Sequence, residues 1–581
     1  MSTQLSLPDA NLHASADVRL GTLDASEQQE SQIIVERAVE RGLTLPASQP
    51  LFFILGLLFT AAASLVTLGA GLPPIASYGQ DSFIMFDGAW RVLHGQRPHL
   101  DFFSAFGPLS YLISAAGLWA SKFAAVGIVY SSAAVGLAVG IWTLLLIRTR
   151  LEAWSALLCL CFVVLFWLAP FPLGEPFELS GYAMQYNRLG YALLSLILIE
   201  LYLPAASGSR FSWLYGGLST GLATGLLLTL KVNYFFVALL LIGPAYAATG
   251  KTRKHIPAML TGFLIVAVAL VVYLRWDVSS MARDILNTAL ARRVRFAQSH
   301  DALRTVARNA TEMFGLLGLA ALAFLFPSSV FARSRRSPAT RILLFIAIVL
   351  LSDFALSSSN TQRAGMPLVQ MAMLIIASKL VRQCLRGAER SKARVALSGA
   401  IAVALWVALL PTLMATVNAW GLAMVARSRP QLSAASAMID APHLAGLRFY
   451  DRIDPTGVDH EEANGKTYAS FVNEGLHLIR ANSASSETIG CLCFSNPFSY
   501  ALLRDPASGG SPFFDYGTNF TERFLPPATR LVGNADILMY QKGGYRGGRT
   551  NILLEHCSAL LARHYDKVAE SENWILFKRR A

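Results

Sequence analysis

Apolar runs long enough to cross a bilayer recur along most of this chain and constrain its fold more than any other feature. A helix needs about 20 apolar residues to cross roughly 30 Å of hydrocarbon. Eleven such runs can be drawn, several of them short, at residues 51–72, 124–147, 151–170, 188–203, 212–230, 234–248, 257–274, 311–327, 341–357, 366–381 and 397–417. They lack the period-two alternation of barrel strands. The sequence therefore predicts an all-α polytopic membrane protein with about eleven transmembrane helices.

Composition agrees with this fold class and excludes others. Of the 581 residues, 54% are hydrophobic and 15% are charged, which is too apolar for a soluble chain of this length. The net charge of +13 lies in loops without a nucleic-acid motif, so nucleic acid is not an expected partner. Residues 1–50 lack the pattern of a cleavable signal, and their polar composition predicts a cytoplasmic tail that is disordered or loosely helical.

The basic loops predict the orientation in the membrane. Lys and Arg gather in cytoplasmic loops, and alternate connections are basic, at 148–150, 210, 251–254, 333–341 and 382–394. This places the N-terminus in the cytoplasm, and the loop 77–113 and the tail 418–581 outside the cytoplasmic membrane. One segment opposes this topology, because seven arginines between 275 and 308 then lie in an external loop.

Three domains follow from these boundaries: a cytoplasmic tail to residue 50, a transmembrane domain over 51–417, and an external domain over 418–581. The last contains strand-like pieces at 488–494, 535–540 and 574–578 and a helical stretch near 551–563, which predict a small α/β domain. Its cysteines Cys491, Cys493 and Cys557 could form a disulfide outside the cell. Which pair would form stays open.

The loop 77–113 concentrates charge beside the first apolar run. From Asp81 to His94 an apolar stripe recurs at helical spacing, which predicts an amphipathic helix lying on the membrane. A second short helix is expected over 109–121, after the turn at Gly107. A purely structural interpretation also exists, in which Asp87 pairs with Arg91 and Asp81 caps the helix.

This loop resembles the first external loop of the GT-C superfamily of membrane glycosyltransferases, which use polyprenyl-phosphate sugar donors. The resemblance lies in Asp81 at the start of a juxtamembrane helix, His94-Gly95-Gln96-Arg97-Pro98, Asp101, and Gly107-Pro108-Leu109-Ser110-Tyr111. The branch with protein O-mannosyltransferases and lipid A aminoarabinose transferases is the most similar. The many spans and the external C-terminal domain fit the same architecture.

The resemblance implies that Asp81 is a general base, which removes the proton of an acceptor hydroxyl as it attacks the anomeric carbon. The departing phosphate then needs nearby cations or a metal. The family often has a second acidic residue where Ser82 stands, so no metal ligand is assigned and a divalent metal stays open as a cofactor. The residues expected to bind substrate are Asp87, His94, Arg97, His99, Asp101, Tyr186, Asn187, Arg188, Lys231, Asn233 and Arg363.

Several of these candidates have an ordinary alternative. Arg188 could hold phosphate or reach the lipid headgroups, and Lys231 could simply mark the topology at the end of a glycine-rich span. Arg363 is the strongest single candidate for a phosphate ligand. In the basic external segment, Arg292, Arg293 and Arg295 are candidates, while an amphipathic helix on anionic lipid explains most of its arginines.

The expected partners are a polyprenyl-phosphate-linked sugar, membrane lipids, and an envelope glycan, lipid or protein as acceptor. Two other functions are alternatives for this sequence. An oligosaccharide ligase or polymerase using a polyprenyl-diphosphate glycan would share the architecture. A transporter or flippase of lipid-linked sugars would show internal repeats and helices broken near the bilayer centre, and the sequence shows no convincing repeat.

Overall fold

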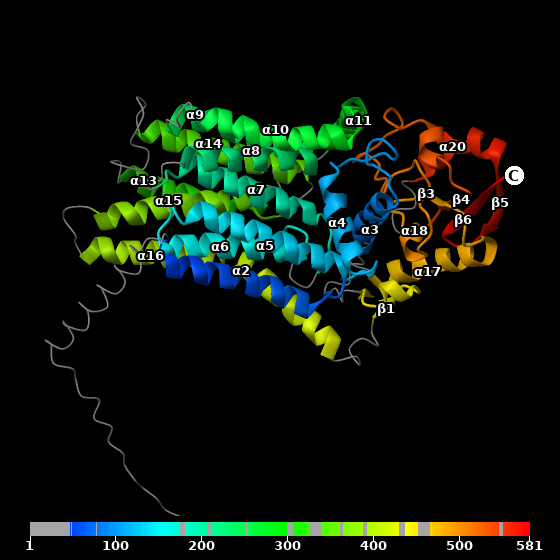
Figure 1. Cartoon of the computed structure of the whole chain (residues 1–581), viewed down its shortest axis with the longest axis horizontal. Coiled ribbons are helices and arrows are strands. Elements are labelled where there is room, and N and C mark those ends of the chain that lie inside the picture. Colours follow the sequence, from blue (N-terminus) through cyan, green and yellow to red (C-terminus); the bar gives the residue numbers. More distant parts are fainter. Residues whose placement is uncertain are drawn as a thin grey trace, which may run out of the picture.

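The structure is a computed structural model. It describes residues 47, 49–76, 78–174, 180–205, 212–249, 254–298, 306–325, 338–360, 364–386, 392–428, 436–450, 465–544 and 550–580. Within these ranges the molecule has a helical bundle at one side and a small domain with a sheet at the other (Figure 1).

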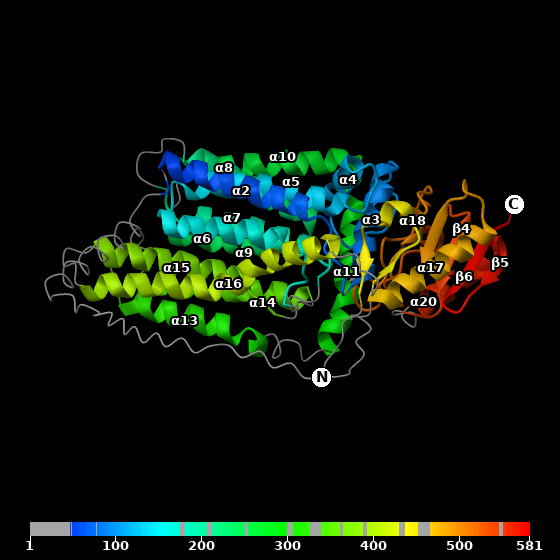
Figure 2. The ribbon, with the colours of Figure 1, turned by 90° about the horizontal axis from the view of Figure 1, so that it is seen from below.

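The bundle holds one helix for each predicted apolar run. The helices are α2 (Pro50–Ala70), α5 (Gly127–Ile147), α6 (Ala153–Leu168), α7 (Gln185–Tyr202), α8 (Ser212–Leu230), α9 (Val232–Thr249), α10 (His255–Tyr273), α13 (Ala310–Leu325), α14 (Pro338–Ser359), α15 (Pro367–Arg386) and α16 (Lys392–Ser428). They run side by side in both ribbon views (Figures 1 and 2). Seven of the described helices are long and apolar enough to cross a membrane, and several shorter apolar helices accompany them. The all-α polytopic prediction is confirmed.

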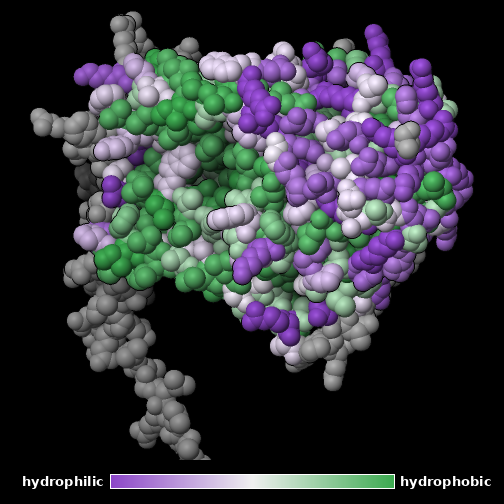
Figure 3. Space-filling model, turned by 45° about the vertical axis from the view of Figure 1, so that its right-hand side comes forward, coloured by the Kyte–Doolittle hydropathy of each residue, from purple (hydrophilic) through white to green (hydrophobic). Residues whose placement is uncertain are grey.

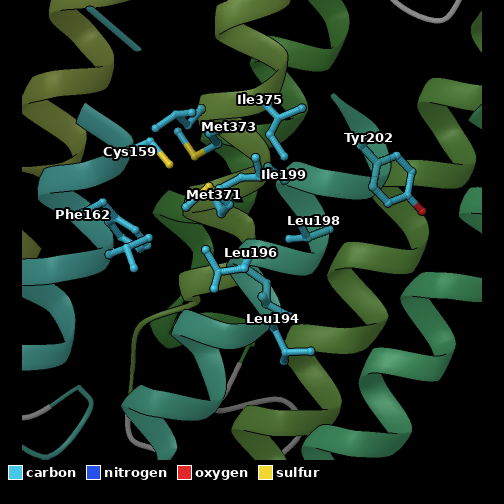
Figure 4. Close-up of a cluster of buried hydrophobic side chains, with 14 of the residues drawn as sticks. Cys159, Phe162, Leu194, Leu196, Leu198, Ile199, Tyr202, Met371, Met373 and Ile375 are labelled. Atoms are coloured by element: carbon cyan, nitrogen blue, oxygen red, sulfur yellow. The ribbon is translucent and has the colours of Figure 1, made fainter. Parts of the chain in front are cut away.

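Burial separates the centre of the bundle from its rim. The central helices α6, α7 and α15 bury most of their residues, and their side chains interlock in one cluster (Figure 4). By contrast α2 and α10 expose many apolar side chains, such as Leu58 and Leu264. Figure 3 shows this apolar surface over the bundle and a polar surface over the smaller domain. An apolar outer surface suits contact with lipid, where it costs no free energy.

Glycines bring α8 and α10 into close contact. A Cβ atom on Gly221 would lie 1.9 Å from the carbonyl oxygen of Met259, and one on Gly262 would lie 2.4 Å from that of Leu218. Small residues allow this backbone approach in membrane helices, where packing drives helix association. The glycine-rich pattern of α8 therefore has a packing role.

We expect Gly221→Leu to destabilise the protein, because the new side chain has no space against α10. Overpacking costs about 1–3 kcal/mol or more. Gly243→Ala in α9 is the matched control, since nothing lies within 4 Å of its added Cβ atom. Thermal unfolding in detergent should show a lower midpoint for Gly221→Leu alone. Equal midpoints for both variants would contradict the packing role.

Two short helices and one long one cover the same end of the bundle. They are α3 (Gly79–Leu93) and α4 (Leu109–Ala120), both predicted, and α11 (Val278–Gln298), which follows α10. Figure 2 shows α11 running crosswise over the bundle end. The basic external segment is thus partly a helix beside the juxtamembrane loop.

The sequence predicts that α3 lies on the membrane with its apolar stripe, and this prediction is wrong. Its apolar stripe contacts the smaller domain: Phe86 stacks on Tyr500 with ring centroids 5.0 Å apart, and Phe83 lies 6.0 Å from Tyr468. The Trp90 indole N–H donates to the carbonyl oxygen of Arg504 at 2.8 Å. An apolar stripe alone does not distinguish lipid from a protein partner, and here the partner is a domain almost 400 residues later in the chain.

The smaller domain is built on a four-stranded sheet with strand order β3-β4-β6-β5. Its strands are β3 (Ile489–Leu492), β4 (Ile537–Gln541), β5 (Tyr565–Glu570) and β6 (Trp574–Arg579); β3 and β4 are parallel and the other pairs antiparallel. Helices α17 (Gly465–Asn482), α18 (Phe498–Ala501), α19 (Ala528–Val532) and α20 (Asn551–His564) accompany it. A two-stranded sheet of β1 (Ala437–Met438) and β2 (Arg448–Phe449) precedes them, with a 3-10 turn at Pro442–Leu444.

Three of these strands and α20 coincide with the predicted pieces, whereas β5 was not predicted. Its residues Asp566, Lys567 and Val568 are exposed and show no apolar face. Cys491 and Cys493 form the disulfide, and Cys557 is a buried free thiol.

Charged residues form a network at the end of the bundle that lies away from the smaller domain. Glu200 pairs with Arg150 and, at 3.3 Å, with His255, while Arg382 pairs with Glu152 at 2.6 Å. Arg150 and Arg382 belong to connections predicted to face the cytoplasm, and Glu152, Glu200 and His255 lie at the adjoining ends of α6, α7 and α10. The loop 77–113 and the tail lie together at the opposite end, which supports the prediction that they share one side of the membrane.

Cysteine labelling tests this topology. Lys122 and Arg148 lie just beyond the two ends of α5, and both are exposed. We expect an impermeant maleimide added to intact cells to label Lys122→Cys but not Arg148→Cys. The four free cysteines of the described part are buried and should react slowly. Labelling of Arg148→Cys from outside would reverse the orientation.

Candidate active site

Lys231 is a buried cation at the outer end of the bundle. Its side chain is 9% exposed, and its ammonium donates to Oδ1 of Asn360 at 2.7 Å and of Asn187 at 3.3 Å. The rings of Tyr186 and Phe106 lie 4.9 and 5.6 Å from Nζ. No carboxylate of the described residues lies within ion-pair distance of this ammonium. A buried cation with neutral partners is costly alone and therefore suits an anionic ligand.

The local sequence explains why Lys231 is held here. It lies at the break between α8 and α9, where Asn233, in the first turn of α9, accepts a hydrogen bond from the Tyr234 N–H at 3.0 Å. The Asn233 amide also donates to Oδ1 of Asn360 at 3.0 Å, and the Asn360 amide donates to the Tyr234 hydroxyl at 2.9 Å. Polar side chains from α9 and α14 thus fix the position of the ammonium.

The Gly107-Pro108 turn packs directly on this break. The N–H of Gly107 donates to the carbonyl oxygen of Leu230 at 3.0 Å, and a Cβ atom on Gly107 would lie 2.0 Å from the carbonyl oxygen of Thr229. Only glycine allows this approach. The motif of the first external loop therefore has a direct structural link to Lys231.

Asp81 and Arg292 complete the group of charges. Asp81 lies in the first turn of α3, and Arg292 lies on α11. Both lie near enough to Tyr186 for their charges to act on it, and Arg292 lies near enough to act on Lys231. One carboxylate and two basic side chains therefore lie near Tyr186 at the same end of the bundle.

Aromatic rings form one wall of this group. Phe106 lies 4.4 Å from Tyr186 and stacks on Phe513 with ring centroids 5.3 Å apart. Phe513 comes from the smaller domain, so this domain takes part in the site. The sequence did not single out Phe106 or Asn360, because their roles depend on contacts between distant segments. Phe513 belongs to a group of aromatic residues in the tail that could form a sugar-binding surface or be buried in the domain core.

Asp87 belongs to a buried junction between α3 and the smaller domain. It is fully buried, accepts from Arg91 Nε at 2.7 Å, and accepts from the Asn496 amide at 2.9 Å. Burial raises the pKa of the Asp87 carboxyl, and Arg91 opposes this effect. Arg91 also donates to the carbonyl oxygens of Ala507 and Gly509. The pairing of Asp87 with Arg91 is confirmed, and we do not retain Asp87 as a substrate ligand.

The predicted ligands between residues 94 and 101 likewise hold segments together. The His94 ring lies 4.2 Å from that of Trp90, and its Nε2 is 3.4 Å from the exposed Asp505. Arg97 donates to the carbonyl oxygen of Tyr273 at 2.8 Å, and the Arg97 N–H donates to Asp101 at 2.6 Å. These contacts give His94, Arg97 and Asp101 partners within the protein, and their assignment to substrate binding stays a prediction.

His99 joins three segments at one carboxylate. Asp284 on α11 is fully buried, lies 3.2 Å from His99 Nδ1, and accepts from both terminal nitrogens of Arg530 at 2.8 and 3.1 Å. Arg530 also donates to the carbonyl oxygen of His99 at 2.8 Å. This junction fixes α11, and with it Arg292, against the loop and the smaller domain.

Arg188 has a structural position. Its guanidinium donates to the carbonyl oxygens of Phe166 and Phe171, both at 2.8 Å, and lies over the Phe166 ring. It therefore closes the end of α6, and we leave it out of the proposed phosphate site. Arg363 lies outside the described residues, as do the side chains of Arg293 and Arg295.

The described part of the chain contains no group of three or more His, Cys, Asp or Glu side chains placed to hold a metal ion. The candidate site consists of Asp81, Tyr186, Lys231, Arg292 and the asparagines 187, 233 and 360.

Comparisons with known proteins return few matches. No protein-family model and no curated protein matches the chain. Among solved structures, the chain is similar to ArnT from Cupriavidus metallidurans bound to undecaprenyl phosphate, with 14% identity, a TM-score of 0.41, and coverage of 91% of this chain and 98% of that one. The apo state of ArnT gives 13% identity, a TM-score of 0.39 and coverage of 90% and 97%. A likeness at this level does not by itself establish a shared activity.

Proposed function

We propose that this protein is a membrane glycosyltransferase that transfers a sugar from a polyprenyl-phosphate donor to an envelope glycan, lipid or protein. The reaction takes place at the external face of the cytoplasmic membrane. The observation that carries the proposal is the buried ammonium of Lys231, whose hydrogen-bond partners among the described residues are neutral asparagines and which lies within the electrostatic influence of Arg292. Such a pair of cations at the outer end of a membrane bundle suits the phosphate of a lipid.

The reaction then needs few chemical groups. The acceptor oxygen forms a bond to the anomeric carbon as the bond from this carbon to the phosphate oxygen breaks. Asp81 takes the acceptor proton, and the polyprenyl phosphate leaves with the electron pair. Lys231 and Arg292 stabilise the negative charge that develops on the phosphate. Tyr186 lies 4.9 Å from the Lys231 ammonium and near Asp81 and Arg292, so it is a neighbour of all three proposed groups.

Two features support catalysis at the surface over transport through the bundle. Asp81 on α3, Arg292 on α11 and Lys231 between α8 and α9 form a group to which the smaller domain adds Phe513. The helices α3 and α11 lie at one end of the bundle (Figure 2). A transporter usually binds its cargo near the bilayer centre, at broken helices. Here the chain breaks at Lys231, where α8 ends and α9 begins, and this point lies at one end of the bundle and not near its centre.

A donor panel tests the proposal and separates it from the ligase alternative. Purified protein would be incubated with radiolabelled undecaprenyl-phosphate monosaccharides, and separately with undecaprenyl-diphosphate oligosaccharides, in the presence of envelope extract. We expect label in the acceptor only with the monophosphate donors. Transfer only from the diphosphate donors would support a ligase, and no transfer from either would overturn the proposal.

A further inference from the structure

A small cavity with mostly apolar walls and several serine hydroxyls lies next to the proposed reaction centre, enclosed mainly by α4, α5 and α7. Its volume is about 30 Å³. A water molecule needs about 10–15 Å³ on the same measure, so the cavity has room for about two water molecules or one small polar substituent. It is too small for a whole sugar ring.

Serine hydroxyls are the main polar groups in the lining of the cavity. Ser110, Ser114 and Ser131 line it, with Gln185 on the wall near α7. Ser114 and Ser131 donate to backbone carbonyls of their own helices, which leaves their oxygens able to accept. Ser110 differs, since it is 5% exposed and its Oγ has no hydrogen-bond partner among the residues that the structure describes. Most buried hydroxyls are paired, so this hydroxyl is available to a polar group that enters the cavity.

The walls of the cavity connect it to the charged groups. Tyr186 lines the cavity and also lies under the Lys231 ammonium, and Leu230 on the wall directly precedes that lysine. Met85 on the wall lies one helical turn after Asp81 on α3. The anomeric carbon must lie between the base and the phosphate, so part of the sugar ring lies beside this cavity.

We propose that this cavity receives one hydroxyl or hydroxymethyl substituent of the transferred sugar, and that Ser110 forms a hydrogen bond with it. The inference rests on the proposed function and adds a determinant of donor specificity. The cavity accepts a small polar group and excludes a bulky one such as an acetamido group, because Met85, Ile113 and Leu189 close its walls. Ser110 is thus a specificity residue, distinct from the charged groups that perform the transfer.

A substrate and protein double-mutant cycle tests this assignment. The kcat/KM of wild type and Ser110→Ala would be measured with the preferred undecaprenyl-phosphate sugar and with its monodeoxy analogues. We expect Ser110→Ala to lower kcat/KM about 10-fold for the parent donor, as for the loss of one buried hydrogen bond. For one deoxy analogue, which already lacks the partner hydroxyl, the same substitution should have little effect.

Two controls keep the test specific. Ser64→Ala removes another buried serine hydroxyl without a partner, on α2 and away from the cavity, and should leave the discrimination among donors unchanged. Ser114→Val fills part of the cavity and should reduce kcat/KM more for the parent donor than for that deoxy analogue. Binding of undecaprenyl phosphate without a sugar should be the same in wild type and Ser110→Ala.

The possible outcomes are distinguishable. Additive losses for Ser110→Ala and every deoxy analogue, in an active enzyme, would overturn the cavity assignment and leave the proposed function intact. A wild-type protein that transfers no sugar from any donor would overturn both.

Discussion

Asp81→Asn is expected to lower the rate of sugar transfer by about 10²–10⁴-fold, the usual effect of removing a general base. The amide keeps the shape of the side chain and most of its hydrogen bonding, but it cannot accept the acceptor proton. Because α3 is held by Arg91 and by aromatic contacts with the smaller domain, the fold should not change. The loss should appear in turnover and not in the affinity for the donor.

Initial rates with saturating donor, together with the thermal unfolding midpoint, check this expectation. Asp505→Asn is a matched control, since this aspartate is exposed on the smaller domain and lies outside the site. Near-normal turnover of Asp81→Asn would exclude Asp81 as the base.

Lys231→Met is expected to reduce turnover by about 10²–10³-fold, similar to the removal of a group that stabilises charge in a transition state. Methionine keeps much of the length and apolar body of lysine but removes the positive charge. The departing phosphate then loses the cation that has no carboxylate partner among the described residues. Stability should be unchanged or higher, because removing an unpaired buried charge relieves its desolvation cost.

A large loss of activity without a loss of stability distinguishes a functional lysine from a structural one. Lys379→Met, in α15, is the matched control and should retain activity. Binding of undecaprenyl phosphate should weaken in Lys231→Met. If Lys231→Met instead unfolds at a lower temperature and keeps normal turnover, Lys231 is part of the packing and the phosphate is held elsewhere, with Arg363 the next candidate.

Hydropathy was sufficient to predict the bundle, because a membrane-spanning helix must satisfy its backbone hydrogen bonds internally and needs a minimum apolar length. All eleven predicted runs correspond to helices of the described bundle. The strands β3, β4 and β6 were also predictable, since they are short apolar segments. The exposed strand β5 was missed because Asp566, Lys567 and Glu570 give it no apolar face.

The site was only partly predictable, since its residues come together through long-range contacts. Lys231 could be chosen because a cation at the end of an apolar helix is unusual. The pairing of Asp87 with Arg91 was one of the predicted alternatives, because the two residues lie one turn apart on the same helix. The sequence could not show that Asn496 would join this pair, or that His99 would meet Asp284, because these partners lie far away in the sequence.

The most direct test of the proposed function follows both products of a single turnover. Purified protein in excess over a doubly labelled undecaprenyl-phosphate sugar would be mixed with acceptor, and labelled acceptor and free undecaprenyl phosphate would be measured over time. We predict that both appear at the same rate and in equal amounts, and that with Asp81→Asn both appear about 10²–10⁴-fold more slowly. Donor that remains intact, or moves across the membrane of a proteoliposome without releasing undecaprenyl phosphate, would contradict a transferase.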